Sequence, residues 1–87
     1  MVKKSSNDFE AFFVKNYESV LATLITITGD RERAVDATQE AFIKASARWS
    51  KVGSYDIPAA WVRRVAINAS RDGWRSDQRR RRRESLN

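Results

Sequence analysis

Residues 24–42 read LITITGDRERAVDATQEAF, a stretch that joins the end of one predicted helix to the start of the next. Gly29 suits the position just after a helix C-terminus, because glycine adopts the left-handed conformation without steric cost. Asp30 suits the N-cap of the following helix, because its carboxylate accepts hydrogen bonds from free backbone amides. The stretch therefore predicts two consecutive helices joined by a tight turn.

The segment before Gly29 predicts an amphipathic helix over about residues 8–28. Asn7 and Glu10 have the spacing of a capping box with Asn7 as the N-cap. Successive residues of a helix are about 100° apart, so one broad face of this helix is apolar and is expected to be buried. That face holds Phe9, Phe12, Phe13, Tyr17, Val20, Leu21, Leu24 and Ile27.

The second predicted helix begins after Asp30 and runs to about Lys51. Its alanines would let another helix approach closely, since the distance between packed helices depends on the side chains between them. The predicted buried face is made of Ala34, Ala37, Ala41, Phe42, Ala45, Trp49 and Val52. The opposite face is mixed and holds Arg33, Asp36, Gln39, Glu40, Ile43 and Ala47.

The segment 53–58 breaks this helix, and a third helix is expected from about Pro58 to about Ser76, because proline is tolerated in a first helical turn. We expect residues 1–7 to be a tail, 8–78 a helical domain, and 79–87 a basic tail that begins an interdomain linker. The predicted fold is all-α, a small three-helix bundle with room for one short extra helical turn. The buried stripe of the third helix would be Pro58, Trp61, Val62, Val65, Ala66, Ala69 and Gly73.

Composition limits the functions open to this chain of 87 residues. It has no cysteine and no histidine, so it lacks thiolate ligands, the commonest metal ligand and the commonest general base. We therefore expect neither enzymatic activity nor a metal or other cofactor. No apolar run reaches the roughly 20 residues of a spanning helix, and no signal peptide is recognisable at the N-terminus. We expect a cytoplasmic protein with no membrane partner.

The charge pattern favours a polyanionic partner. The formal net charge is +6, and the non-core side of the third helix is rich in arginine. Arginines there would neutralise phosphates, Trp74 would stack on an unpaired base, and Asn68 would bond a base edge. The alternative is a solvated basic face with Trp74 folded back onto the core. That side comprises Arg63, Arg64, Ile67, Asn68, Arg71, Trp74 and Arg75, followed by the run Arg79–Arg83, which a flexible tail would also explain.

Two other features have open interpretations. Ile43 lies among polar residues on the outer face of the second helix, which suggests a protein contact, although single exposed hydrophobic residues are common. The loop from Val52 to Ile57 is flanked by Trp49 and Trp61. It is a candidate specificity loop or a simple connection capped by Asp56.

Two motifs resemble the sigma-70 family of RNA polymerase sigma factors. Residues 28–30 (Thr-Gly-Asp) followed by 34–42 resemble the signature Thr-Gly-Asp…Ala-x-Asp-x-x-Gln-Glu-Ala-Phe. Residues 58–72 resemble the stretch Trp-Leu-x-x-Ile-Ala-x-Asn-x-x-x-Asp of the same region. The resemblance covers about residues 9–83, and it is to region 2 of the small extracytoplasmic-function group.

This resemblance implies two partners. A surface with Asp36, Gln39, Glu40 and the neighbouring Ile43 would dock on the coiled-coil clamp helices of the polymerase β′ subunit. The third helix and the loop before it would bind and melt the non-template strand of the promoter −10 element and hold a flipped base. An anti-sigma factor is a further partner of such proteins. The expected DNA-binding residues are Val52, Gly53, Ser54, Tyr55, Asp56, Arg63, Arg64, Asn68, Arg71, Trp74, Arg75, Arg79 and Arg80.

The sequence departs from the family pattern at three points. Val52 stands where many members have an aromatic residue, and Gly73 weakens the third helix by about 1 kcal/mol relative to alanine. The family's second DNA-binding domain is absent, so we expect this chain to be one domain of a longer protein. Two other hypotheses stay open, a basic domain that binds nucleic acid without sequence preference and a helical protein-interaction module.

Overall fold

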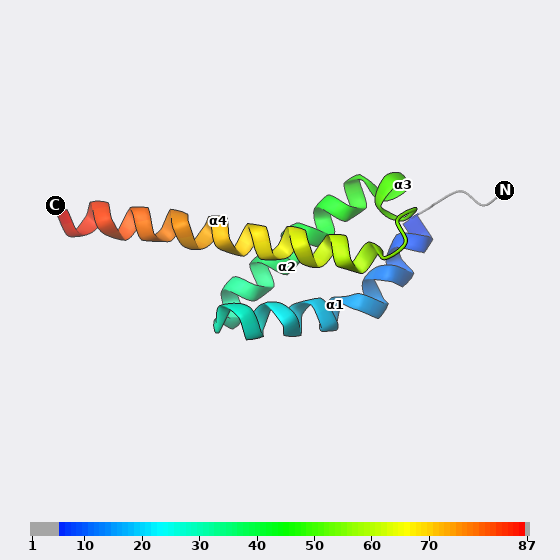
Figure 1. The fold of residues 1–87 in the computed structure, drawn as a ribbon, viewed down its shortest axis with the longest axis horizontal. Coiled ribbons are helices and arrows are strands. Elements are labelled where there is room, and N and C mark those ends of the chain that lie inside the picture. The colour runs from blue at the N-terminus through cyan, green and yellow to red at the C-terminus, as the bar shows by residue number, and fades with distance from the viewer. Residues whose placement is uncertain (1–5, 87) are drawn as a thin grey trace.

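The computed structural model describes residues 6–86, with side chains from Asp8 to Ser85. Every regular element in this range is a helix, as the sequence predicts, and a short extra turn, for which the predicted fold left room, is the third of four. The helices are α1 (Ser6–Thr28), α2 (Arg31–Ala47), α3 (Trp49–Val52) and α4 (Pro58–Leu86) (Figure 1).

The turn between α1 and α2 forms as its residues predict. Gly29 has a φ of 67°, the left-handed conformation, and its amide donates to the carbonyl of Ile25 over 2.8 Å. Asp30 caps α2, because its carboxylate accepts from the amide of Arg33 over 3.2 Å. The hydroxyl of Thr28 accepts from the Asp30 amide over 3.2 Å. This turn sends α2 back along α1.

The N-terminus of α1 differs from the prediction by two residues. The helix begins at Ser6, so Asn7 lies inside the first turn and is not the N-cap. Its side chain, and with it the predicted capping box to Glu10, lies outside the described side chains. Residues 1–5, predicted to be a tail, also lie outside the described part of the chain.

The core lies where α1 and α4 both meet α2 (Figure 1). All seven residues of the predicted apolar face in the second helical segment are buried, the four alanines among them. Small side chains at these positions let both neighbours approach α2 closely. The other buried apolar residues are Val20, Leu21 and Leu24 of α1, and Val62 and Ala66 of α4.

Three predicted core positions are wrong. Phe13 is 37% exposed and Ile27 is 53% exposed, because the helices beside α1 do not cover the whole of its broad apolar face. Gly73 is exposed, since it borders an open groove between α4 and α2. Conversely, Thr38 and Ser70 are buried, and a rule based on polarity could not have placed them in the core.

The second predicted helix is interrupted at Arg48, where φ is −119° and ψ is 27°. The short helix α3 follows, and the Trp49 ring contacts the rings of Phe9 and Phe12 at centroid distances of 5.5 and 5.0 Å. Packing of this large ring against α1 accompanies the break. No glycine or proline marks the position, so the sequence carried no signal for it.

Helix α4 continues ten residues past the predicted end at Ser76 and includes the arginine run. Its C-terminal half projects beyond the other helices, and the molecule is 60 Å long in its longest dimension (Figure 1). No glycine or proline follows Gly73, and arginine and glutamine are good helix formers, which explains the continuation. The division into a domain and a basic tail at residue 79 stays a prediction.

Candidate functional site

The loop between α3 and α4 is closely supported by Trp49. The amide of Gly53 donates to the carbonyl of Trp49 over 2.8 Å, and that of Tyr55 donates to Val52 over 3.1 Å. A Cβ atom on Gly53 would lie 2.8 Å from Cε2 of the Trp49 ring, closer than real contacts allow. Glycine at this position therefore lets the loop lie directly on the ring.

The loop divides into a buried base and an exposed tip. Val52, one of the expected DNA-binding residues, is only 1% exposed, so its side chain belongs to the core and supports the loop from beneath. Ser54, Tyr55 and Asp56 are exposed and follow directly. The hydroxyl of Ser54 donates to the carbonyl of Lys51 over 2.6 Å, which ties the tip back to α3.

The predicted DNA-binding residues of α4 form two neighbouring stripes rather than one arc. At about 100° per residue, the exposed residues Arg64, Asn68, Arg71 and Arg75 fall within about 60° of one another. The second stripe, about a quarter-turn away, contains the half-buried Arg63 and the 53% exposed Trp74. Trp74 is therefore not folded back onto the core.

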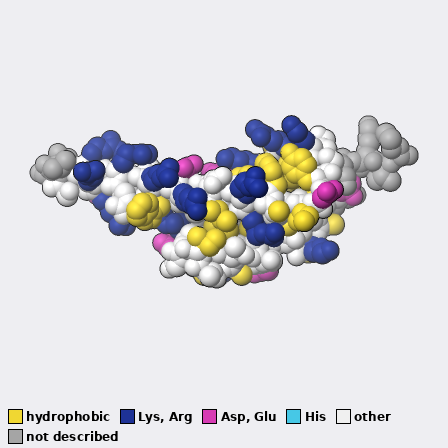
Figure 2. Space-filling view, in the orientation of Figure 1, with side chains coloured by type: hydrophobic (Ala, Val, Ile, Leu, Met, Phe, Trp, Pro, Cys, Tyr) yellow, Lys and Arg dark blue, Asp and Glu magenta, His cyan; other side chains and the backbone are white. Residues whose placement is uncertain are grey.

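The basic character of α4 continues along its whole length. Figure 2 shows basic side chains along α4, all of them arginines, on the face turned to the viewer, with hydrophobic side chains between them. Arg79 is exposed on the outer side of the helix. Arg80, also expected to bind DNA, lies about 100° further round and pairs with Asp77 over 3.1 Å. It therefore faces α2 more than the outer stripes.

On α2, the four predicted polymerase-binding residues share one exposed face. Asp36, Gln39, Glu40 and Ile43 are all exposed, and Ile43 is exposed to 68%. This α2 outer face separates two grooves. On one side an apolar groove of about 290 Å³ is lined by Gln39 and Ile43 together with Phe9, Phe13, Phe42 and Ser46.

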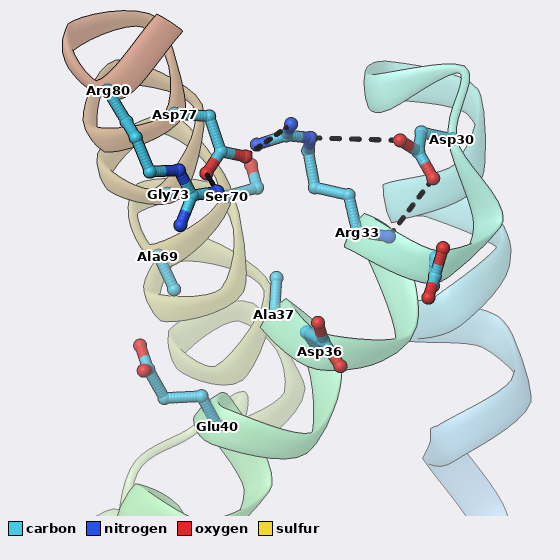
Figure 3. A pocket seen from close by; sticks show the side chains of 11 residues that line it. Asp30, Arg33, Asp36, Ala37, Glu40, Ala69, Ser70, Gly73, Asp77 and Arg80 are labelled. Atoms are coloured by element: carbon cyan, nitrogen blue, oxygen red, sulfur yellow. Dashed lines mark hydrogen bonds and ion pairs between the residues drawn. The ribbon is translucent and has the colours of Figure 1, made fainter. Parts of the chain in front are cut away.

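The groove on the other side of the α2 outer face is polar. It lies between α2 and α4, has a volume of about 540 Å³, and is lined by Asp36 and Glu40 among others (Figure 3). At its far end, Arg33 of α2 bonds Asp77 of α4, with Nη2 and Oδ2 separated by 2.9 Å. Helical spacing predicted Arg33 on the outer face of the second helix and did not mark Asp77. Arg33 lies three residues after Asp30, and Asp77 lies three residues before Arg80. This spacing was the one sequence feature that indicated ion pairs.

Two kinds of site have no candidate in the part of the chain that the structure describes. No group of three or more carboxylate side chains gathers in a way that could hold a metal ion. None of the helices from residue 6 to residue 86 has the length and apolarity needed to cross a membrane.

The chain matches the family model described as Sigma-70 region 2 over residues 12–81. It belongs to the sigma-70 region 2 family. This family acts in transcription initiation, in promoter recognition and in binding of RNA polymerase. No curated protein and no solved structure matches the chain. The match includes α2, the loop and α4 as far as Arg81, so both candidate surfaces lie in the part of the chain that the family model covers.

Proposed function

We propose that this sigma-70 region 2 domain is of the extracytoplasmic-function group, and that it docks on RNA polymerase through α2 and reads the promoter −10 element through α4. The observation that carries the proposal is the presence of two chemically different exposed faces on one bundle. The α2 outer face offers two carboxylates around an apolar side chain, whereas α4 offers arginines around Trp74. Such a module supplies binding and leaves the chemistry to the polymerase.

The α2 outer face has the composition of a protein interface. Ile43 supplies an apolar centre, and the polar groups of Asp36, Gln39 and Glu40 surround it. The adjacent groove floored by Phe42 adds an apolar recess beside this centre. We assign this face to the clamp helices of the polymerase β′ subunit, which places the protein in the cytoplasm of a bacterium.

The basic face of α4 and the tip of the preceding loop suit unpaired bases. Ser54 and Tyr55 at the loop and Asn68 on the helix offer groups that bond base edges, while Trp74 offers a stacking surface. Bases within a duplex hide these edges and faces, so binding would favour a separated strand. Capture of flipped bases on the non-template strand is therefore the proposed route to promoter melting.

Docking is tested by reversing the charge of the α2 outer face. Asp36→Arg with Glu40→Arg should abolish pull-down of the β′ clamp helices, because two carboxylates that would accept hydrogen bonds from the partner are replaced by larger cations. The matched control is Glu10→Arg with Glu18→Arg, the same change of charge on exposed positions of α1. Circular dichroism should stay helical in both variants. Unchanged binding of the α2 variant, or equal loss in the control, would refute the assignment.

The same proteins, when tested for binding to single-stranded DNA, distinguish the proposed function from its two alternatives. A protein-interaction module would bind the polymerase fragment and no single-stranded DNA. A sequence-blind basic domain would bind scrambled and cognate strands equally. An anti-sigma factor, the further partner we expect, would be tested with the same α2 variants.

A further inference from the structure

One contact joins the projecting half of α4 to the rest of the molecule. Arg33, in the first turn of α2, and Asp77, in α4, are 44 residues apart in the sequence and meet at 2.9 Å. Their side chains are 20% and 37% exposed. Between Arg71 and Ser85, Asp77 is the one residue that the structure does not leave exposed. The contact therefore lies beyond the last buried residue of α4, Ser70.

The contact belongs to a chain of alternating charges (Figure 3). Asp77 also accepts from Arg80 over 3.1 Å, and Arg33 lies 4.0 Å from Asp30. Asp30 is itself fixed as the N-cap of α2, so the network is anchored at a rigid end of the bundle. A Cβ on Gly73 would lie 3.8 Å from Nη1 of Arg33, so the guanidinium extends close to the α4 backbone.

We propose that the Arg33–Asp77 ion pair is a positioning contact, which sets the direction in which α4 leaves the bundle and hence where its last arginines meet DNA. A helix is stiff, so loss of the contact at Asp77 would let the segment beyond Ser70 tilt as one piece, and the displacement would grow toward the end of α4. The attraction of an arginine for a phosphate falls with distance, and misplaced arginines contribute less. The DNA part of this inference rests on the proposed function.

The first arm of the test separates position from charge. Asp77→Arg and Glu84→Arg both add two positive charges to α4, and the two positions are seven residues apart on the same side of the helix. If charge alone mattered, both would strengthen binding of a fluorescent single-stranded oligonucleotide of random sequence. We expect Glu84→Arg to strengthen it, and Asp77→Arg to weaken it by about two- to five-fold, the scale of a partly exposed ion pair.

The second arm restores the contact with its charges exchanged. Arg33→Asp combined with Asp77→Arg should recover most of the lost DNA affinity, because the opposite charges face each other again, although Asp30 and Arg80 then lie beside like charges. Arg31→Asp combined with Asp77→Arg has the same net charge but leaves Arg33 facing an arginine, and it should not restore binding. Restoration by both double variants, or by neither, would overturn the proposal.

The third arm measures the helix direction without DNA. The chain has no cysteine, so spin labels can be attached at Ser19→Cys on α1 and Ser85→Cys on α4, both exposed. The distance distribution between the labels should be narrow in the wild type, broaden in Arg33→Asp, and narrow again in the charge-exchanged double variant.

An unchanged distribution in Arg33→Asp would overturn the positioning contact. A broadened distribution with no DNA binding by the wild-type chain would uphold the contact and refute the proposed function instead.

Discussion

At the scale of single residues, the two glycines near the candidate DNA surface have opposite roles. Gly53 lies against Trp49, where an added Cβ would be 2.8 Å from both the ring atom Cε2 and the backbone oxygen. Gly73 is exposed in α4, and an added Cβ would meet no atom closer than 3.8 Å. The first glycine is required by packing, whereas the second only weakens a helix.

We expect Gly53→Ala to destabilise the fold and Gly73→Ala to stabilise it. The clash at Gly53 forces the Trp49 ring or the loop to shift, which typically costs about 1–3 kcal/mol. Alanine in place of Gly73 should add about 1 kcal/mol of helix stability. Thermal unfolding followed by circular dichroism measures both. Equal effects of the two substitutions would show that the loop does not rest on the ring.

Thr38 offers a second test at this scale. Its side chain is 0% exposed and its Oγ1 has no hydrogen-bond partner in the structure. Thr38→Val keeps the shape and removes a buried unsatisfied hydroxyl, so it should raise the free energy of unfolding by about 1 kcal/mol. Thr26→Val is the control, because that hydroxyl is exposed and bonds Ala22 over 3.0 Å. A loss of stability at Thr38 would mean that its hydroxyl is satisfied.

At the scale of elements, α4 is the helix that carries most of the residues proposed to bind DNA. The arginine run continues it as helix, and at about 100° per residue the five arginines point all around its axis. A single strand passing along one side can therefore contact only two or three of them. Because Arg80 pairs with Asp77, we expect it to contribute less to DNA binding than the other four arginines.

Replacing Arg79–Arg83 by glutamine should flatten the salt dependence of DNA binding. Two or three phosphate contacts on a single strand correspond to a change in the slope of log affinity against log salt of about 1.4–2.1. A variant that retains Arg80 and changes the other four should lose the same amount. Loss of affinity should be equal for cognate and mismatched strands, because phosphate contacts carry no sequence information. An unchanged slope would indicate that the run is a linker without DNA contact.

The helices and turns also show which features of the fold could be predicted from the sequence. The glycine and aspartate at residues 29 and 30 located the first turn because both act through local backbone geometry. The break at Arg48 was missed because tertiary packing decides it. The extension of α4 past Ser76 was missed because the run of arginines was taken as a tail, although no glycine or proline follows Gly73. Among site residues, the exposed face of α2 followed from helical spacing. The burial of Val52 and the Arg33–Asp77 contact depend on how distant segments meet, which spacing alone does not reveal.

At the scale of the whole molecule, the surfaces proposed for the two partners lie on different helices of one bundle. The α2 outer face carries carboxylates and Ile43, and α4 with its preceding loop carries the arginines, Asn68 and Trp74. The aromatic cluster around Trp49 fixes α1, α3 and the loop relative to one another. A protein bound on α2 would therefore hold the DNA-binding face in a defined place on the polymerase.

Strand selection shows whether this domain reads the sequence of an unpaired strand, as we propose. The chain is bound to polymerase core and used to select strands from a randomised single-stranded oligonucleotide pool. Affinities are then measured for the selected strand, its complement, their duplex and a scrambled strand. We predict tightest binding to the selected single strand, with Asn68→Ala reducing its advantage over a mismatched strand by about 1–3 kcal/mol. Equal affinity for selected and scrambled strands, or tighter binding to the duplex, would contradict the account.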